Sequence, residues 1–434
     1  MSKDEYKLSR AFYVTMNALE HTLTLLTGGA YLAKLTTTIG ISDGMTAILS
    51  MLASFATAFQ VFSIMLSGKT PVKRWLAPLH SLAHVFLALI YLLPFFTSIK
   101  ASVAFFILIT LARVFLSIIS PAKSTWLLSL VDDDKRVKFV SKSTVVALVS
   151  YSIASVIISS MIDKFESKGD TNAAFLAIFF IMATLIIVDI CLLLFTKEKP
   201  APRVSGVSPL KSVGELFRNK HFKYTFAVYV LVDFALAFST PFYGTYQINE
   251  LGFSMTFVAV SDIVVSIVQI LTVYAAGRFS KGRSSAAIFR YSHIFAAAAF
   301  IFVPFSNAEN GRLLFTAYRI LYAMYVGTYS VSYTNLIFDI VPAHQRTSAF
   351  AVKSMGIGIV GFTTTVLTSL FVERVQANGN VIFGINAYAQ QILSVLTFLI
   401  LASTVIFHEI FGRALLECGD NAGGGGDLNS PLDK

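Results

Sequence analysis

Long apolar stretches separated by short polar segments run through this chain from about residue 10 to residue 411. A helix needs about 20 apolar residues to cross the hydrocarbon core of a bilayer, and each of these stretches is long enough. The alternating strands that a membrane barrel would need do not occur in the sequence. The pattern predicts twelve membrane-spanning helices, near residues 10–36, 44–67, 75–98, 101–121, 139–163, 173–196, 222–247, 255–277, 285–305, 311–338, 347–373 and 384–411.

The longest polar segment between two apolar stretches contains KEKPAPRVSGVSPLK and separates six predicted spans from six. We therefore expect an all-α polytopic membrane protein with an N-terminal six-helix half at 1–196 and a C-terminal six-helix half at 222–411. The segment at 197–221 is expected to be a cytoplasmic central loop. The Gly-rich polar tail at 412–434 is expected to be disordered and cytoplasmic.

Composition agrees with this picture. The chain has 434 residues, of which 55% are hydrophobic and 13% charged, whereas soluble domains carry about 25% charged residues. The net charge of +10 does not indicate nucleic acid, because the basic residues gather on one side of the predicted membrane. Of the 34 Lys and Arg residues, 26 fall on that side, Lys123 and Lys353 among them, and Arg113 and Arg319 lie inside spans. The other side has six: Lys34, Lys100, Lys164, Lys168, Arg312 and Arg374.

Such an asymmetry of Lys and Arg predicts that both termini are cytoplasmic. We expect an integral, multi-pass protein of a bacterial cytoplasmic membrane, the cell inner membrane. The two cysteines, Cys191 and Cys418, predict neither a disulfide framework nor a metal cluster.

Four ionisable residues lie deep inside predicted spans: Glu20, Arg113, Asp233 and Arg319. A charge at the centre of a bilayer is costly, so such residues usually face a cavity or a partner. We expect Glu20, Asp233 and Arg113 to take part in proton coupling. Three interpretations of Glu20 stay open: a proton switch that gains and loses an Arg partner, a fixed pair with Arg113 that fastens helices, and direct contact with a substrate.

Polar residues also recur at helical spacing on several spans. The first span carries Tyr13, Asn17, Glu20, Thr24, Thr27 and Tyr31, which three- and four-residue spacings place on one helix face. Span 10 has tyrosines at 318, 322, 325, 329 and 333, and span 8 has Asp262 and Gln269 on one face. The alternative is hydrogen bonding between helices. The predicted substrate-binding residues are Arg113, Arg319, Asn17, Thr24, Thr27, Tyr31, Tyr243, Tyr322, Tyr325, Tyr329, Asp262 and Gln269.

The spacing of several histidines and of one acid gives weaker evidence for a functional role. His80 and His84 are four residues apart on span 3, but a metal would need further ligands, so no metal site and no cofactor are expected. His293 is expected to be packed. Asp189, near the inner end of span 6, is expected to pair with cations of the loops.

The two halves repeat each other. SGKTPVKR after span 2 matches AGRFSKGR after span 8, and LARVF in span 4 matches AYRIL in span 10. With 6+6 spans and a basic central loop, the chain resembles the major facilitator superfamily from about residue 8 to 411. The loop motif of that family is met only by Gly68, Lys73 and Arg74, and in the second copy by Gly277, Arg278, Gly282 and Arg283; its Asp is missing.

The resemblance implies gating loops at Gly68, Lys73, Arg74, Gly277, Arg278 and Arg283, and a cavity surrounded by spans 1, 4, 7 and 10. It also implies a secondary active transporter that moves a small polar solute by alternating access between rocking halves. We expect proton coupling, as a symporter or antiporter, in a monomer that contacts membrane lipids, a small-molecule solute and a proton or other ion, without nucleic acid.

The alternatives are a drug or metabolite exporter of the same fold and a membrane-embedded enzyme acting on a lipid-linked substrate. Span 5 lacks the Gly/Pro motif of drug–proton antiporters. An enzyme would normally cluster His, Asp or Glu at an interface, whereas these loops hold mostly Lys, Arg and Ser. We therefore do not expect an enzyme.

Overall fold

The computed structural model describes residues 5–60, 62–63, 66, 71–96, 99–132, 135–198, 214–279, 285–342, 345–382 and 384–412 of the chain. These residues form long helices and one short hairpin of β1 (Val381–Ile382) and β2 (Ile385–Asn386). The helices of the first half are α1 (Lys7–Leu26), α2 (Gly29–Ile39), α3 (Asp43–Ala56), α5 (Val72–Leu89), α6 (Ile99–Ser129), α7 (Arg136–Glu166) and α8 (Thr171–Phe195). Those of the second half are α10 (Lys220–Ala237), α11 (Tyr243–Thr245), α12 (Met255–Phe279), α13 (Ser285–Ala299), α14 (Gly311–Ile340), α15 (Arg346–Ala377) and α16 (Ala389–Phe407).

Each predicted span coincides with one of these helices or with consecutive helical segments. Within the described residues, 9 stretches are long and apolar enough to cross a membrane. The other three predicted spans correspond to α1 with α2, to α3 and to α14. A break shortens the first, α3 has only 14 residues, and the tyrosines and Arg319 lower the mean hydropathy of α14.

The first and seventh spans are each interrupted, which corrects the expectation of continuous helices. In the first, α1 ends at Leu26 and α2 begins at Gly29, whose φ of +52° is a conformation that favours glycine. In the seventh, α10 ends at Ala237. Pro241, which follows in a 3₁₀ turn, has no backbone N–H to continue an α-helix. The two halves thus share a break in their first helix.

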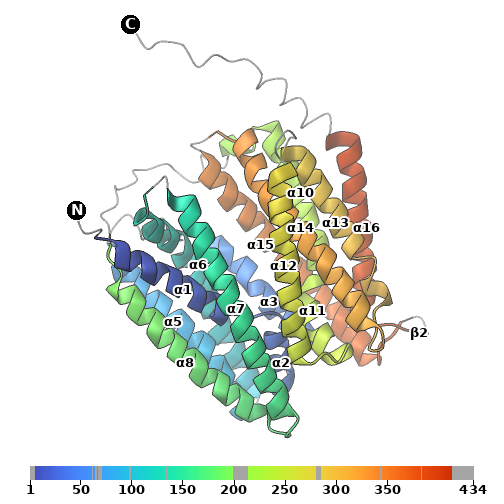
Figure 1. Ribbon diagram of the computed structural model, residues 1–434. Helices are drawn as coiled ribbons and strands as arrows, with labels where there is room; N and C mark the ends of the chain where they lie inside the picture. Colours follow the sequence, from blue (N-terminus) through green and yellow to red (C-terminus); the bar gives the residue numbers. More distant parts are fainter. Residues whose placement is uncertain are drawn as a thin grey trace.

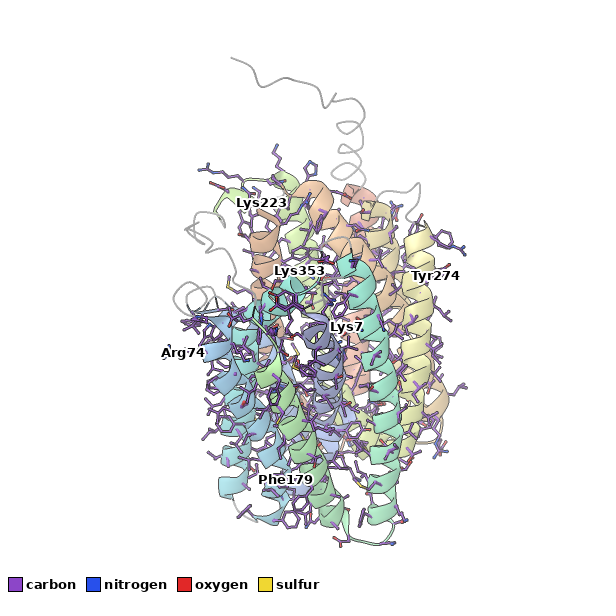
Figure 2. The ribbon with its side chains drawn as sticks, turned by 60° about the vertical axis from the view of Figure 1, so that its left-hand side comes forward. Lys7, Arg74, Phe179, Lys223, Tyr274 and Lys353 are labelled. Atoms are coloured by element: carbon purple, nitrogen blue, oxygen red, sulfur yellow. The ribbon has the colours of Figure 1, made fainter. Side chains whose placement is uncertain are left out.

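The outward faces of the bundle are apolar. Side chains such as Ile187, Leu271 and Leu367 are more than 60% exposed, as expected of a surface that contacts lipid tails. The halves lie side by side, and the start of α1 and the end of α16 both lie toward the upper end of the bundle (Figure 1). In Figure 2, Lys223 lies near that end and Phe179 near the opposite one.

The halves are joined by polar contacts that we call the interhalf seal: Asp43, Asn249, Gln376, Ser42 and Glu373. Asn249 Nδ2 and Gln376 Nε2 donate to the two carboxylate oxygens of Asp43, at 2.9 and 2.8 Å. The hydroxyl of Ser42 donates to Glu373 at 2.6 Å. Because Ser42 and Asp43 follow α2, the seal lies at the end of the bundle away from the termini (Figure 1).

Two close backbone approaches accompany the seal. A Cβ added at Gly244 of α11 would lie 2.7 Å from the carbonyl oxygen of Gly29, and one at Gly358 of α15 would lie 2.3 Å from that of Ser54. No side chain other than hydrogen fits at these positions. The α2–α11 and α3–α15 contacts between the halves therefore depend on glycine.

We expect Gly244→Ala to weaken the sealed arrangement by about 1–3 kcal/mol, the usual cost of forcing a carbon into a packed contact. The measurement is the rate at which a maleimide labels a cysteine at Ala47, which is buried in a cluster with Phe242 and Val372 of the other half, with Cys191 and Cys418 replaced by Ser. Labelling is faster in Gly244→Ala. Gly214→Ala is the matched control, because a Cβ there meets nothing within 4 Å. Equal rates in both variants would contradict the prediction.

Candidate functional site

A cavity of about 320 Å³ lies in the N-terminal half between α1, α5 and α6. Its size is at the lower end of the roughly 300–1,000 Å³ typical of small-molecule sites. We call it the N-half cavity. Its polar lining consists of Tyr13, Asn17, Glu20, Thr24, His80, His84, Arg113, Ser120, Lys123 and Ser124.

Glu20 forms an ion pair across this cavity with Lys123 of α6. The sequence ended the fourth span at residue 121 and counted Lys123 with the inner segments beyond it, but α6 continues to Ser129, and Lys123 is 9% exposed within this helix. Lys123 is largely buried and Glu20 is partly exposed to the cavity; removing one partner of such a pair leaves the other charge uncompensated within the bundle. The pair therefore holds α1 against α6.

Arg113 has a different partner from the one expected. Its Nη2 donates to the carbonyl oxygen of Thr27 at 2.7 Å and to the hydroxyl of Thr27 at 3.2 Å. Because α1 ends at Leu26, carbonyls at its C-terminus have no partner within the helix, and a cation is favourable there. The break in the first span thus creates the acceptor for Arg113, and the fixed Glu20–Arg113 pair does not form.

The break also divides the polar stripe of the first span. Tyr13, Asn17, Glu20 and Thr24 line the cavity, whereas Tyr31 on α2 is 3% exposed and bonds to Ser155 and Ser159 of α7. The single helix face predicted for all six residues is therefore wrong. Asn17 lines the cavity and also donates to Ser143 of α7, at 3.0 Å to the hydroxyl.

His80, His84 and Asp189 form a cluster behind the cavity. The imidazole Nε2 of His80 lies 2.5 Å from Asp189 Oδ2 on α8, and both side chains are fully buried. Asp189 does not reach the loop cations expected for it, because it faces α5 inside the half.

In the C-terminal half, Arg319 of α14 pairs with Asp262 and bonds to Ser261, both on α12. Tyr243 is buried and its hydroxyl lies 2.7 Å from that of Ser394 on α16. Gln269 is half-buried on α12, seven residues beyond Asp262. The sequence predicted these residues as substrate contacts. In this conformation Arg319, Asp262 and Tyr243 bond to neighbouring helices.

The tyrosines of α14 form a ladder, with neighbouring ring centroids 5.3–5.6 Å apart from Tyr318 to Tyr333. The ammonium of Lys353 lies over three tyrosine rings, at 3.6 Å from the Tyr333 centroid, 4.8 Å from Tyr229 and 5.2 Å from Tyr329. Such cation–π contacts stabilise a cation away from water.

Lys353, inside the predicted span 347–373 and counted with the inner side, is 9% exposed on α15 and lies within the bundle (Figure 2). Lys353 interacts electrostatically with Asp233 of α10. Asp233 in turn interacts electrostatically with Tyr322, Tyr325 and Tyr329. The predicted residues Asp233, Tyr322, Tyr325 and Tyr329 are thus brought together around a lysine that sequence reasoning did not select.

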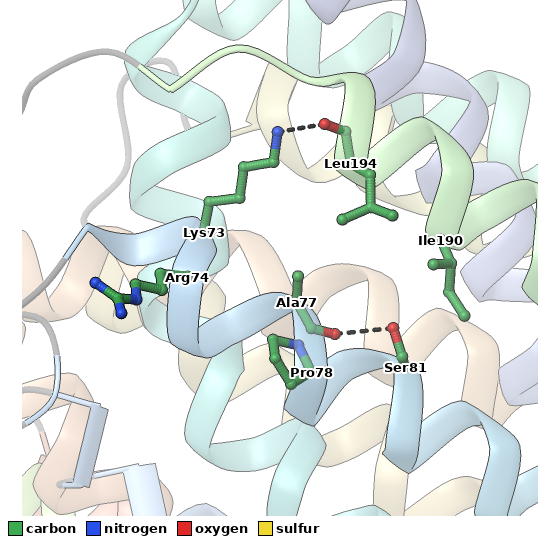
Figure 3. A pocket seen from close by; sticks show the side chains of 7 residues that line it. All are labelled: Lys73, Arg74, Ala77, Pro78, Ser81, Ile190 and Leu194. Carbon is green, nitrogen blue, oxygen red and sulfur yellow. Dashed lines mark hydrogen bonds between the residues drawn. The ribbon is translucent and has the colours of Figure 1, made fainter.

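The predicted gating residues are partly described. Lys73 donates to the carbonyl oxygens of Leu194 and Thr196 at the C-terminal end of α8. Together with Arg74 it lines a groove of about 400 Å³ (Figure 3). The first N–H groups of α5 donate to the carboxylate of Glu198, at 2.7 Å from Val72 N. Arg278 lies over the ring of Tyr274 at 5.1 Å, and Gly277 has open space. Gly68 and Arg283 lie outside the described residues.

The sequence matches the Major Facilitator Superfamily over residues 14–365. The chain belongs to this family. The family and its solved relatives support a secondary transporter. No curated protein sequence gives a significant match.

Solved structures share the fold at low sequence identity. A mutant form of the nucleoside transporter NupG has a TM-score of 0.73 at 14% identity, covering 94% of this chain and 100% of its own. A D-xylose–proton symporter has a TM-score of 0.64 at 14% identity, covering 92% and 97%. A bacterial homologue of the human lysosomal transporter Spinster, inward-facing and unoccupied, has a TM-score of 0.62 at 14% identity, covering 97% and 98%. Such identities show the fold alone.

We expect Asp262→Asn to destabilise the protein by about 3 kcal/mol, because it leaves the charge of Arg319 without its counter-ion in the bundle. The measurement is thermal unfolding in detergent. Asp132→Asn is the control: the Asp132–Lys135 pair is 63% and 68% exposed, so the loss should stay under about 1 kcal/mol. A loss at Asp262 no larger than at Asp132 would contradict the assignment of a structural ion pair.

Proposed function

We propose that the protein is a proton-coupled secondary transporter of a small polar solute, and that Glu20 carries the coupled proton. The observation that supports this most is the Glu20–Lys123 ion pair in the wall of the N-half cavity. Charged residues facing a cavity inside membrane spans are usual in ion and proton paths.

The chemistry of such a pair suits coupling. A carboxylate in an apolar surrounding stays ionised while an ammonium lies against it and takes up a proton when that ammonium moves away. Because α1 and α6 belong to the same half, rocking of the halves changes the access of water and solute to the pair, whereas separating the two charges needs a movement within the N-terminal half. Glu20 also lies close enough to Tyr13 on α1 and to His80 and His84 on α5 to interact electrostatically with them.

The arrangement of the halves is consistent with one state of alternating access. The interhalf seal closes the end away from the termini. The cavity residue Tyr13 lies only six residues after the first residue of α1, Lys7. We infer a conformation open toward the side that bears the termini, which the distribution of Lys and Arg predicts to be the cytoplasm.

Arg113 suggests the class of solute. It lines the cavity, and its Nε is buried without a hydrogen-bond partner among the described residues. A buried donor of this kind favours a ligand that supplies oxygen acceptors. Such a solute would carry hydroxyl, carbonyl or carboxylate groups. The similar structures include one titled as a nucleoside transporter and one as a D-xylose–proton symporter, and both of those solutes are rich in oxygen acceptors.

The test uses Glu20→Gln in proteoliposomes, with a solute found by a binding screen of the purified protein. We expect accumulation driven by an imposed pH gradient to fall at least tenfold, because the amide cannot take up a proton. Exchange of labelled for unlabelled solute, which needs no net proton movement, should continue.

Glu166→Gln is the matched control, since Glu166 pairs with Lys34 but is 46% exposed and lies outside the cavity. It should keep pH-driven accumulation. Full pH-driven accumulation by Glu20→Gln would remove Glu20 from the coupling role and leave Asp233 as the next candidate.

A further inference from the structure

The cluster of His80, His84 and Asp189 brings three metal-ligating side chains together inside the N-terminal half. Their ligand atoms all lie within 4.8 Å of one another, and all three residues are buried. The two histidines are one turn apart on α5 with ring centroids 4.3 Å apart, and Asp189 approaches from α8. Neither the fold nor the proposed transport step requires this combination.

The cluster leaves polar atoms without partners. Asp189 Oδ1 and His80 Nδ1 are buried and make no hydrogen bond with the described residues. The described cation facing this carboxylate is Lys123, whose ammonium is already paired with Glu20. An ionised carboxylate buried without a counter-ion is costly, so the site has a place for a positive charge.

The orientation of His84 suits a ligand role. Its Nδ1 lies 2.9 Å from the carbonyl oxygen of His80. A ring N–H donated to a backbone carbonyl leaves Nε2 as the lone-pair nitrogen, and metal-bound histidines usually have such a partner. His80 and His84 also line the N-half cavity, which provides a route of entry and room for a water molecule as a further ligand.

We propose that His80, His84 and Asp189 form a binding site for one divalent transition-metal ion of the zinc class. Two imidazoles and a carboxylate favour zinc, cobalt or nickel over calcium and magnesium, which prefer oxygen ligands. Three protein ligands with an open fourth position are typical of zinc sites that are not purely structural. Binding through His80 Nε2 moves the proton of the neutral imidazole to Nδ1, which has no other partner among the described residues, so no proton leaves the site when Asp189 is ionised.

The C-terminal half supplies an internal comparison. His293 lies eight residues after the first residue of α13, as His80 does in α5. It stacks on His408 at 5.1 Å between ring centroids, and both histidines are buried. No acid has a ligand atom grouped with these histidines in the described part of the chain. This histidine pair therefore tests whether buried imidazoles alone bind the metal.

The experiment uses the full-length chain, purified in detergent with a tag free of histidine, treated with a chelator and titrated with Co²⁺. The wild type should bind one Co²⁺ and develop the intense visible absorption of a four- or five-coordinate ion. His84→Ala and Asp189→Asn should each weaken binding more than about 100-fold, since loss even of a group that only orients a ligand costs roughly 10–100-fold.

His293→Ala should bind Co²⁺ as the wild type does. His84→Gln provides a second ligand variant of similar volume if His84→Ala fails to fold. The proposal is overturned if the wild type binds no stoichiometric Co²⁺, if its spectrum is that of the six-coordinate aqueous ion, or if His293→Ala loses binding as His84→Ala does. Because no solute or pH gradient enters the measurement, its result is independent of the transport assay.

Discussion

The cost of a charge inside an apolar bundle is the constraint on which this structure depends. A charge buried in a low-dielectric interior needs an opposite charge or a set of hydrogen bonds. Glu20 meets this need with Lys123, and Asp262 meets it with Arg319. Asp189 contacts His80, and Lys353 lies over tyrosine rings near Asp233. Each of these contacts joins two different helices, so satisfying the charges also fixes how the helices pack.

The two halves share a plan but differ in chemistry. Arg113 and Arg319 occupy equivalent places in the repeated sequence, yet Arg113 binds the carbonyl of Thr27 and Arg319 binds a carboxylate. The N-terminal half holds its acid–lysine pair in an open cavity, while the C-terminal half holds a lysine among tyrosines.

The fold was largely predictable because hydropathy is a local property of the sequence. The same pattern predicted Glu20, Arg113, Asp233 and Arg319 inside spans, and each lies within a long helix of the bundle. The partner of Glu20 was not predicted, because Lys123 lies just beyond the predicted end of a span and was taken for a loop residue. Lys123 lies two residues beyond the predicted span 101–121, but α6 extends to Ser129.

The helix breaks were also missed, although the sequence contained a signal for each. Gly28 and Gly29 adjoin inside the first apolar stretch, and Pro241 follows Ser239 and Thr240 in the seventh. Both signals are weak in a long hydrophobic run, where neighbouring helices can satisfy the freed backbone groups. Asp189 and the two histidines are 105 or more residues apart, so only the packing of α5 on α8 brings them together.

Glu20 and Lys123 compensate each other's charge inside the bundle. A double-mutant cycle with Glu20→Gln and Lys123→Met, measured by thermal unfolding in detergent, tests it most directly. We expect a coupling free energy of at least about 1 kcal/mol between Glu20 and Lys123. The corresponding cycle of Glu20→Gln with Arg113→Met should give a coupling free energy near zero. Additive effects for Glu20 and Lys123, or a larger coupling between Glu20 and Arg113, would contradict it.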